Sequence, residues 1–157
     1  MRVGIGYDSH RFGPGTSVLL GGVRIPSAQA LIGHSDADAV AHAVTDAILG
    51  AAALGDIGAL FPDTDPANKG RNSIEMLGVA TQRLRSAGWR VSNVDVTVIC
   101  ESPNIARHRD LMRGTLAIAL GVQADLIWVK GKTNEQMGWI GRGEGIAVVA
   151  VAAVVRT

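Results

Sequence analysis

Three residues near the start of the chain have the types and spacing of a metal centre. Asp8 and His10 lie two positions apart at the end of a strand-like segment at residues 3–8, so their side chains leave the same face of that strand. His42 lies within an alanine-rich segment at residues 36–53 that we expect to be a helix. One aspartate and two histidines supply three ligands and leave a fourth position open, as catalytic zinc sites do. The alternative is that these side chains are separate and bond only to backbone groups.

The expected helix carries two further carboxylates on the same stripe as His42. Asp38 and Asp46 stand four residues before and four residues after it, and therefore share its face of the helix. Asp38 either caps the helix or takes a metal role. Asp46 either orients the second imidazole nitrogen of His42 or is a solvated surface charge.

The residues before this helix are candidates for anion binding. His34 and Ser35 precede the first turn, where free backbone amides and the positive end of the helix dipole favour a phosphate. Ser35 alternatively caps the helix, with Asp38 three positions on as the acidic partner of a capping box. The two roles do not exclude each other.

Two later segments also carry side chains suited to ligands. The loop at residues 56–65 contains Asp56, Asp63 and Asp65. Their carboxylates suit the hydroxyls of a sugar or polyol, and a solvated acidic turn is the alternative. The segment at residues 130–135 could place lysines, a threonine hydroxyl and the Glu135 carboxylate near phosphates, although it lacks the spacing of a P-loop.

The pattern of apolar residues predicts the elements that must position these side chains. We expect strands at residues 3–8, 18–20, 23–26, 91–100, 126–130 and 146–155, and helices at 36–53, 73–86 and 106–120. The last strand is apolar at both its odd-numbered and its even-numbered positions, so we expect it to be covered on both faces. The order of elements predicts an α/β (α+β) fold: a single domain over residues 1–157, a mixed β-sheet with helices layered on one face, and the other face left for subunit contact.

The composition limits the class of partner. The 157 residues carry a formal net charge of +1 with no basic run, which argues against nucleic-acid binding. Hydrophobic residues make up 47% of the chain and charged residues only 18%, so we expect some apolar surface to meet another subunit. The longest apolar run is about half a membrane span, and Cys100 is the only cysteine. We therefore expect a cytoplasmic protein with no leader and no membrane segment.

Five motifs together resemble the 2-C-methyl-D-erythritol 2,4-cyclodiphosphate synthase family. They are G-x-G-Y-D-S-H at 4–10, L-x-G-H-S-D-A-D-A-x-x-H at 31–42, A-A-A-L-G-D-I-G-x-L-F-P-D-T-D-P at 51–66, N-V-D-V-T at 93–97 and T-N-E-x-M-G-x-x-G-R-G-E-G-I-A at 133–147. They span nearly the whole chain without a shift in register. Each alone is unspecific, and their combination is specific.

The resemblance implies a homotrimer whose sheets face the three-fold axis, with active sites between neighbouring subunits. It implies zinc at Asp8, His10 and His42, a second divalent ion (magnesium or manganese) at Glu135, and stabilisation of the transition state by His34 and Thr133. It also implies that Ser35 binds substrate and that the methylerythritol part is held by Asp56, Ile57, Gly58, Phe61, Pro62, Asp63, Thr64 and Asp65. The cytidine end would be received by Cys100, Glu101, Ser102, Pro103, Asn104, Ile105 and Ala106, and by Lys132, Thr133, Asn134 and Glu135. Trp139 and Arg142 would line the substrate and axial-cavity region, where the family can also accommodate isoprenoid diphosphates.

The implied reaction is a cyclisation within one substrate. In 4-diphosphocytidyl-2-C-methyl-D-erythritol 2-phosphate, the 2-phosphate attacks the β-phosphate and expels CMP, so the protein must position the groups and neutralise charge. The chain departs from the family pattern at Asn104, where many members have lysine, and we hypothesise that Lys132 restores that cation. The competing hypotheses are a zinc-dependent phosphoesterase that activates water and a trimeric metabolite-binding protein without turnover.

Overall fold

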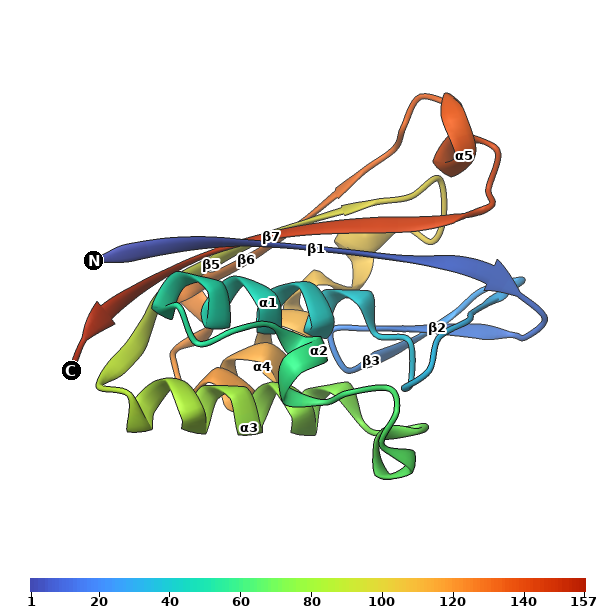
Figure 1. Ribbon diagram of the computed structural model, residues 1–157. Helices are drawn as coiled ribbons and strands as arrows, with labels where there is room; N and C mark the ends of the chain where they lie inside the picture. The colour runs from blue at the N-terminus through green and yellow to red at the C-terminus, as the bar shows by residue number, and fades with distance from the viewer.

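A five-stranded mixed sheet forms one layer of the molecule. The computed structural model describes residues 1–157, and the strand order is β4-β1-β7-β5-β6. All neighbours are antiparallel except β5 and β6, which are parallel. A separate hairpin, β2 with β3, lies below the end of β1 (Figure 1). The strands are β1 Arg2–Gly13, β2 Ser17–Leu20, β3 Val23–Pro26, β4 Ala30–Leu31, β5 Trp89–Ile99, β6 Ile127–Lys132 and β7 Gly145–Arg156.

The three long helices all lie on one side of the sheet (Figure 1). The helices are α1 Ala39–Ala52, α2 Ile57–Leu60, α3 Ser73–Ser86, α4 Arg109–Leu120 and α5 Gly138–Gly141, with 3-10 turns at Pro66–Asn68, Ile105–His108 and Ala124–Leu126. The predicted single-domain α+β fold, with a mixed sheet and helices layered on one face, is confirmed. The short α2, within a segment expected to be loop, was not predicted. No helix is long and apolar enough to cross a membrane.

The start of α1 differs from the predicted one. The helix begins at Ala39, and its N-cap is Asp38, whose side chain accepts a hydrogen bond from the Ala41 amide. The prediction that Ser35 caps this helix is wrong. Asp38 also accepts from the amides of Gly21 and Gly22 at 2.8 and 2.6 Å, which ties the helix start to the turn of the hairpin.

Helix α1 lies unusually close to strand β1. A Cβ atom placed on Gly6 would lie 1.9 Å from the Ala43 carbonyl oxygen, and one on Gly4 would lie 2.2 Å from the Ala47 carbonyl oxygen. No side chain fits at either position unless the helix moves away. The glycines of β1 and the alanines of α1 therefore set the distance between these two elements, and this distance places His42, next to Ala43, against the end of β1.

The core fills the space between the sheet and the helices, and the opposite face of the sheet is bare. In the core, β7 contributes five residues with no exposed surface: Ile146, Val148, Ala150, Ala152 and Val154. On the opposite face, large apolar residues are exposed, including Val3 at 63%, Ile5 at 70% and Tyr7 at 57%. The expectation that β7 is covered on both faces is therefore not met within one chain.

Candidate active site

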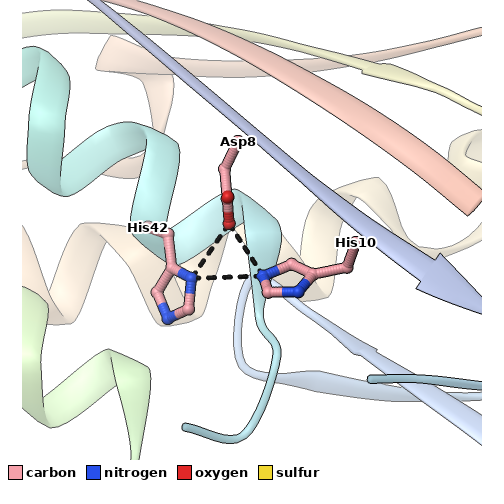
Figure 2. A group of neighbouring side chains, drawn as sticks. All are labelled: Asp8, His10 and His42. Carbon is pink, nitrogen blue, oxygen red and sulfur yellow. Dashed lines mark hydrogen bonds and ion pairs between the residues drawn. The ribbon is translucent and has the colours of Figure 1, made fainter. Parts of the chain in front are cut away.

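Asp8, His10 and His42 converge, as their spacing predicted. Strand β1 supplies the first two residues and helix α1 supplies the third (Figure 2). Asp8 Oδ2 lies 2.9 Å from His10 Nε2 and 2.9 Å from His42 Nδ1, and the two nitrogens are 3.4 Å apart. The alternative of separate, unrelated histidines is therefore wrong.

The donor set and its geometry fit a divalent cation. His10 Nδ1 lies 2.9 Å from the Ile32 carbonyl oxygen, so Nδ1 carries the proton and the Nε2 lone pair faces the cluster. Two Zn–N bonds of about 2.0–2.1 Å at a tetrahedral angle place the nitrogens about 3.4 Å apart. The observed separation is the same. Oxygen and nitrogen lone pairs that face one another at this range need a positive charge between them.

Without a metal, the three side chains share protons. Burial alone would raise the pKa of Asp8, but the hydrogen bonds and charges of His10 and His42 outweigh it and lower this pKa to about 2. For His10, burial would lower the pKa, but the Asp8 carboxylate and the Ile32 carbonyl raise it instead. A cation therefore competes with a proton for this cluster.

Two further carboxylates, Asp38 at the N-cap of α1 and Asp46 within the helix, do not take part in the metal cluster. Asp38 is fully buried and makes only the capping and turn contacts described above, so its capping role is confirmed and a metal role is wrong. Burial raises its pKa, although the three amides oppose this. Asp46 makes no hydrogen bond to His42; its Oδ1 accepts from the Ile57 amide at 2.7 Å. Both interpretations of Asp46 are wrong, and its role is to fix the start of α2.

A cavity of about 160 Å³ opens beside the metal cluster. The loop residues Asp56 and Asp65 do not line it, since their carboxylates cap α2 and the 3-10 turn at Pro66–Asn68. Pro62 and Thr64 are likewise outside the lining. Asn68 and Met76 line it without having been predicted, and no signal in the sequence pointed to them. The lining residues are His10, His34, Ser35, His42, Ile57, Gly58, Phe61, Asp63, Asn68 and Met76.

A second cavity of about 330 Å³ lies where β5 and β6 end. Apart from Gly131, which was not predicted, its lining residues come from the two segments that the resemblance assigned to the cytidine end: Cys100, Glu101, Pro103, Asn104, Ile105, Ala106, Lys132 and Thr133. Its only charged lining residues are Glu101 and Lys132. Burial, with the nearby charge of Glu101, raises the pKa of the Cys100 thiol to about 11, so this cysteine is a packing residue.

Glu101 joins the two loops of the larger cavity. Its Oε1 accepts hydrogen bonds from the amides of Asn134 and Gln136 at 3.0 and 3.1 Å. Glu135 lies between these two residues with an exposed side chain, and its Oε1 accepts from Thr133 Oγ1 at 3.1 Å. Ser102, Asn134 and Glu135 are next to the cavity in sequence and outside its lining.

Trp139 and Arg142 line neither cavity. They belong to α5 and its C-cap, and α5 stands off the sheet on the side opposite the three long helices (Figure 1); both residues are exposed. Arg142 Nε donates to Glu144 Oε1 at 2.6 Å. One chain therefore does not bring these two predicted residues to either cavity.

The two cavities lie at the same end of the sheet and on different strands. The register pairs His10 of β1 with Ile146 of β7, and Ile99 of β5 with Ala147 of β7. Strands β7 and β5 stand between β1 and β6. At roughly 4.8 Å per strand, β1 and β6 are about 14 Å apart across the sheet.

Comparisons with known proteins agree on one family. The sequence model of the YgbB family matches residues 1–155. The 2-C-methyl-D-erythritol 2,4-cyclodiphosphate synthase of Gemmatimonas aurantiaca is 61% identical over 154 residues, which cover 98% of this chain and 93% of the relative. The bifunctional IspDF of Campylobacter jejuni superposes with a TM-score of 0.95 at 42% identity, covering 99% of this chain and 42% of that one. A CDP-bound 2C-methyl-D-erythritol-2,4-cyclodiphosphate synthase superposes with a TM-score of 0.89 at 34% identity, covering 98% of this chain and 100% of that one.

Proposed function

The chain belongs to the YgbB family, whose matched relatives are 2-C-methyl-D-erythritol 2,4-cyclodiphosphate synthases, and from that premise we propose the reaction that it catalyses. It cyclises 4-diphosphocytidyl-2-C-methyl-D-erythritol 2-phosphate to 2-C-methyl-D-erythritol 2,4-cyclodiphosphate and releases CMP, in the non-mevalonate (MEP) pathway to isoprenoid precursors. The enzyme is thus a phosphorus–oxygen lyase. The observation that carries the proposal is the convergence of Asp8, His10 and His42 beside a cavity that His34 and Ser35 also line.

The reaction needs no general base from the protein. A phosphate monoester has its second pKa near 6, so the 2-phosphate is largely dianionic at neutral pH and acts as its own nucleophile. One of its oxygens forms a bond to the β-phosphorus, and the bond from that phosphorus to the oxygen that bridges to CMP breaks. The electron pair leaves with CMP. The task of the site is to hold the two phosphates in line and to offset their charge.

The residues around the smaller cavity suit the phosphates and the methylerythritol part. Asp8, His10 and His42 hold zinc, which supplies positive charge to a phosphate oxygen when it is bound. His34 and Ser35 share the cavity lining with these ligands, so His34 can donate a hydrogen bond to the reacting phosphate. Asp63 lines the same cavity and can accept from hydroxyl groups of the polyol.

The larger cavity suits the cytidine end. The CDP complex of a structural relative supports a cytidyl nucleotide as the ligand class. Lys132 provides a cation and Thr133 a hydroxyl from the same wall, with Thr133 stabilising the transition state. The exposed Glu135 carboxylate holds a second divalent ion, magnesium or manganese, which offsets the charge of the diphosphate.

A homotrimer with sheets facing the three-fold axis would join the two half-sites. In one chain they lie at the ends of different strands, with β7 standing between β1 and β5, and the bare sheet face is apolar at Val3, Ile5, Tyr7, Trp128 and Val151. Burying this face between subunits brings the larger cavity of one subunit toward the metal cluster of its neighbour. We also propose an axial cavity near Trp139 and Arg142 that accepts isoprenoid diphosphates. Residues 1–157 form one synthase domain, and the protein is located in the cytoplasm. A monomer in sedimentation at micromolar concentration would contradict the trimer.

Product analysis tests the activity against its two competitors. The protein is incubated with the cytidyl substrate, zinc and magnesium, and phosphorus NMR follows CMP and the second product. We expect CMP together with the cyclic diphosphate. CMP with a linear phosphate would instead favour a zinc-dependent phosphoesterase, and no CMP would favour a metabolite-binding protein.

A further inference from the structure

The second nitrogen of His42 contacts a side chain from a third element. His42 Nε2 lies 2.8 Å from Ser73 Oγ and 2.9 Å from Ser35 Oγ. Ser73 is the first residue of α3 and has no exposed surface. It is 31 positions away from His42 in the sequence, so only the packing of α3 against α1 brings the two together.

Asp36 fixes the hydroxyl of Ser73. One carboxylate oxygen of Asp36 accepts from the Ser73 amide at 2.9 Å, and the other accepts from the Ser73 hydroxyl. A carboxylate offers only acceptors, so the Ser73 hydroxyl must give its hydrogen to Asp36. The lone pairs of Ser73 Oγ then face His42, and Nε2 must be the nitrogen that carries the proton.

This arrangement determines the tautomer of His42. With the proton on Nε2, the Nδ1 lone pair points at Asp8 and at His10 Nε2, which is the state that a metal ligand requires. Ser35 does not impose this state, because it is half-buried and no carboxylate takes its hydrogen. The oriented hydroxyl is therefore that of Ser73.

We propose that Ser73 and Asp36 are positioning residues of the metal centre: they hold His42 as a ready ligand and so strengthen divalent-metal binding. The inference rests on the proposed metal site at Asp8, His10 and His42. Outer partners of ligating histidines typically contribute about 10–100-fold in metal affinity. A contribution of that size explains why a fully buried polar side chain begins α3 at this point.

Zinc affinity of variants tests the proposal. The dissociation constant is measured by competition with a chromophoric chelator at constant pH for wild type, Ser73→Ala and Thr81→Val. Thr81 is the matched control, since it is also buried in α3 and its hydroxyl bonds only to the Leu77 carbonyl oxygen at 2.8 Å. We expect Ser73→Ala to weaken zinc binding about 10–100-fold and Thr81→Val to leave it unchanged. Equal affinities for the two variants would overturn the proposal.

A double-mutant cycle tests the role of Asp36. Since Asp36 acts through Ser73, Asp36→Asn should weaken zinc binding in the wild-type background and add nothing in the Ser73→Ala background. Additive effects would contradict a shared path.

Hydrogen exchange of the His42 Nε2 proton in zinc-loaded wild type decides if Ser73→Ala does not fold. Slow exchange supports a hydrogen bond from this proton to a fixed buried acceptor, and fast exchange refutes it. If wild type binds no zinc, or His42→Ala binds it equally tightly, the proposed metal centre itself fails.

Discussion

The two cavities at the end of the sheet are built in different ways. The residues of the metal cluster beside the smaller one come from β1 and α1, two elements in direct backbone contact. Ser73, the first residue of α3, contacts His42 of this cluster. The larger one is formed by loops that follow β5 and β6, joined by the bonds of Glu101 to two backbone amides. Packing thus positions the metal cluster that we propose faces the reacting phosphates, while loops form the cavity that we propose binds the part of the substrate that leaves.

This difference divides the expected effects of mutation. Changes in the smaller cavity should affect metal binding and the chemical step, because its geometry depends on fixed distances between elements. Apart from Thr133, which we propose stabilises the transition state, the groups of the larger cavity contact a part of the substrate that is not transformed, so changes to them should affect substrate affinity.

The largest effect is expected for His42→Ala. The substitution removes one metal ligand and the link from the cluster to α3. Loss of several kcal/mol of charge stabilisation lowers kcat by at least about 1000-fold, and tight zinc binding is lost. Isothermal titration with zinc and a CMP-release assay measure both. A variant that keeps full activity would contradict the metal role.

A Gly6→Ala substitution tests the contact between α1 and β1. The new methyl group would lie 1.9 Å from the Ala43 carbonyl oxygen, so α1 must move and carry His42 with it. We expect a loss of about 1–3 kcal/mol in the free energy of unfolding, together with weaker zinc binding. Gly78→Ala is the matched control: it adds a methyl group within α3 where no atom lies within 4 Å, and should stabilise the helix by about 0.5–1 kcal/mol. Urea denaturation compares the two, and equal effects would count against the close contact.

A Lys132→Ala substitution tests the larger cavity. It removes the only cationic side chain that lines this cavity. Charge-assisted hydrogen bonds contribute about 1.5–3 kcal/mol, so we expect KM to rise about tenfold or more, with little change in kcat or zinc affinity. Asn104 lines the same cavity, which is consistent with the hypothesis that Lys132 supplies the cation missing there. An unchanged KM would reject that hypothesis.

The smallest effect is a pH dependence of the metal-free protein. The pKa of Asp8 falls from 3.8 to about 2 on folding, so its stabilisation is present above pH 3.8 and is lost as the pH falls through about 2. The pKa of His10 is raised above 6.5, so its stabilisation is present below pH 6.5 and is lost as the pH rises through the raised pKa. Between these limits, wild type should exceed Asp8→Asn by about 1 kcal/mol in free energy of unfolding. If the difference in free energy of unfolding between wild type and Asp8→Asn stays constant up to pH 9, the coupling between Asp8 and His10 is contradicted.

The sequence predicted the metal cluster and the sheet better than the supports of the cluster. Alternation along β1 and the spacing of Asp8 and His10 depend only on local geometry, which a sequence pattern contains. The roles of Ser73 and Asp46 could not be assigned from spacing. Asp46 lies on the same face of α1 as His42 but accepts from the Ile57 amide, and Ser73 belongs to another helix, α3. The start of α1 was placed too early, with Ser35 as a cap beside Asp38, because the bonds of Asp38 to a distant hairpin were not visible in the sequence. Contacts between remote elements therefore account for most of what the patterns missed.

Anomalous scattering at the zinc edge tests the central claim most directly. Crystals grown with stoichiometric zinc should show one strong peak per chain, bonded to Asp8 Oδ2, His10 Nε2 and His42 Nδ1, and no peak in crystals of His42→Ala. A strong peak elsewhere, with none between these three side chains, would contradict the account of the site.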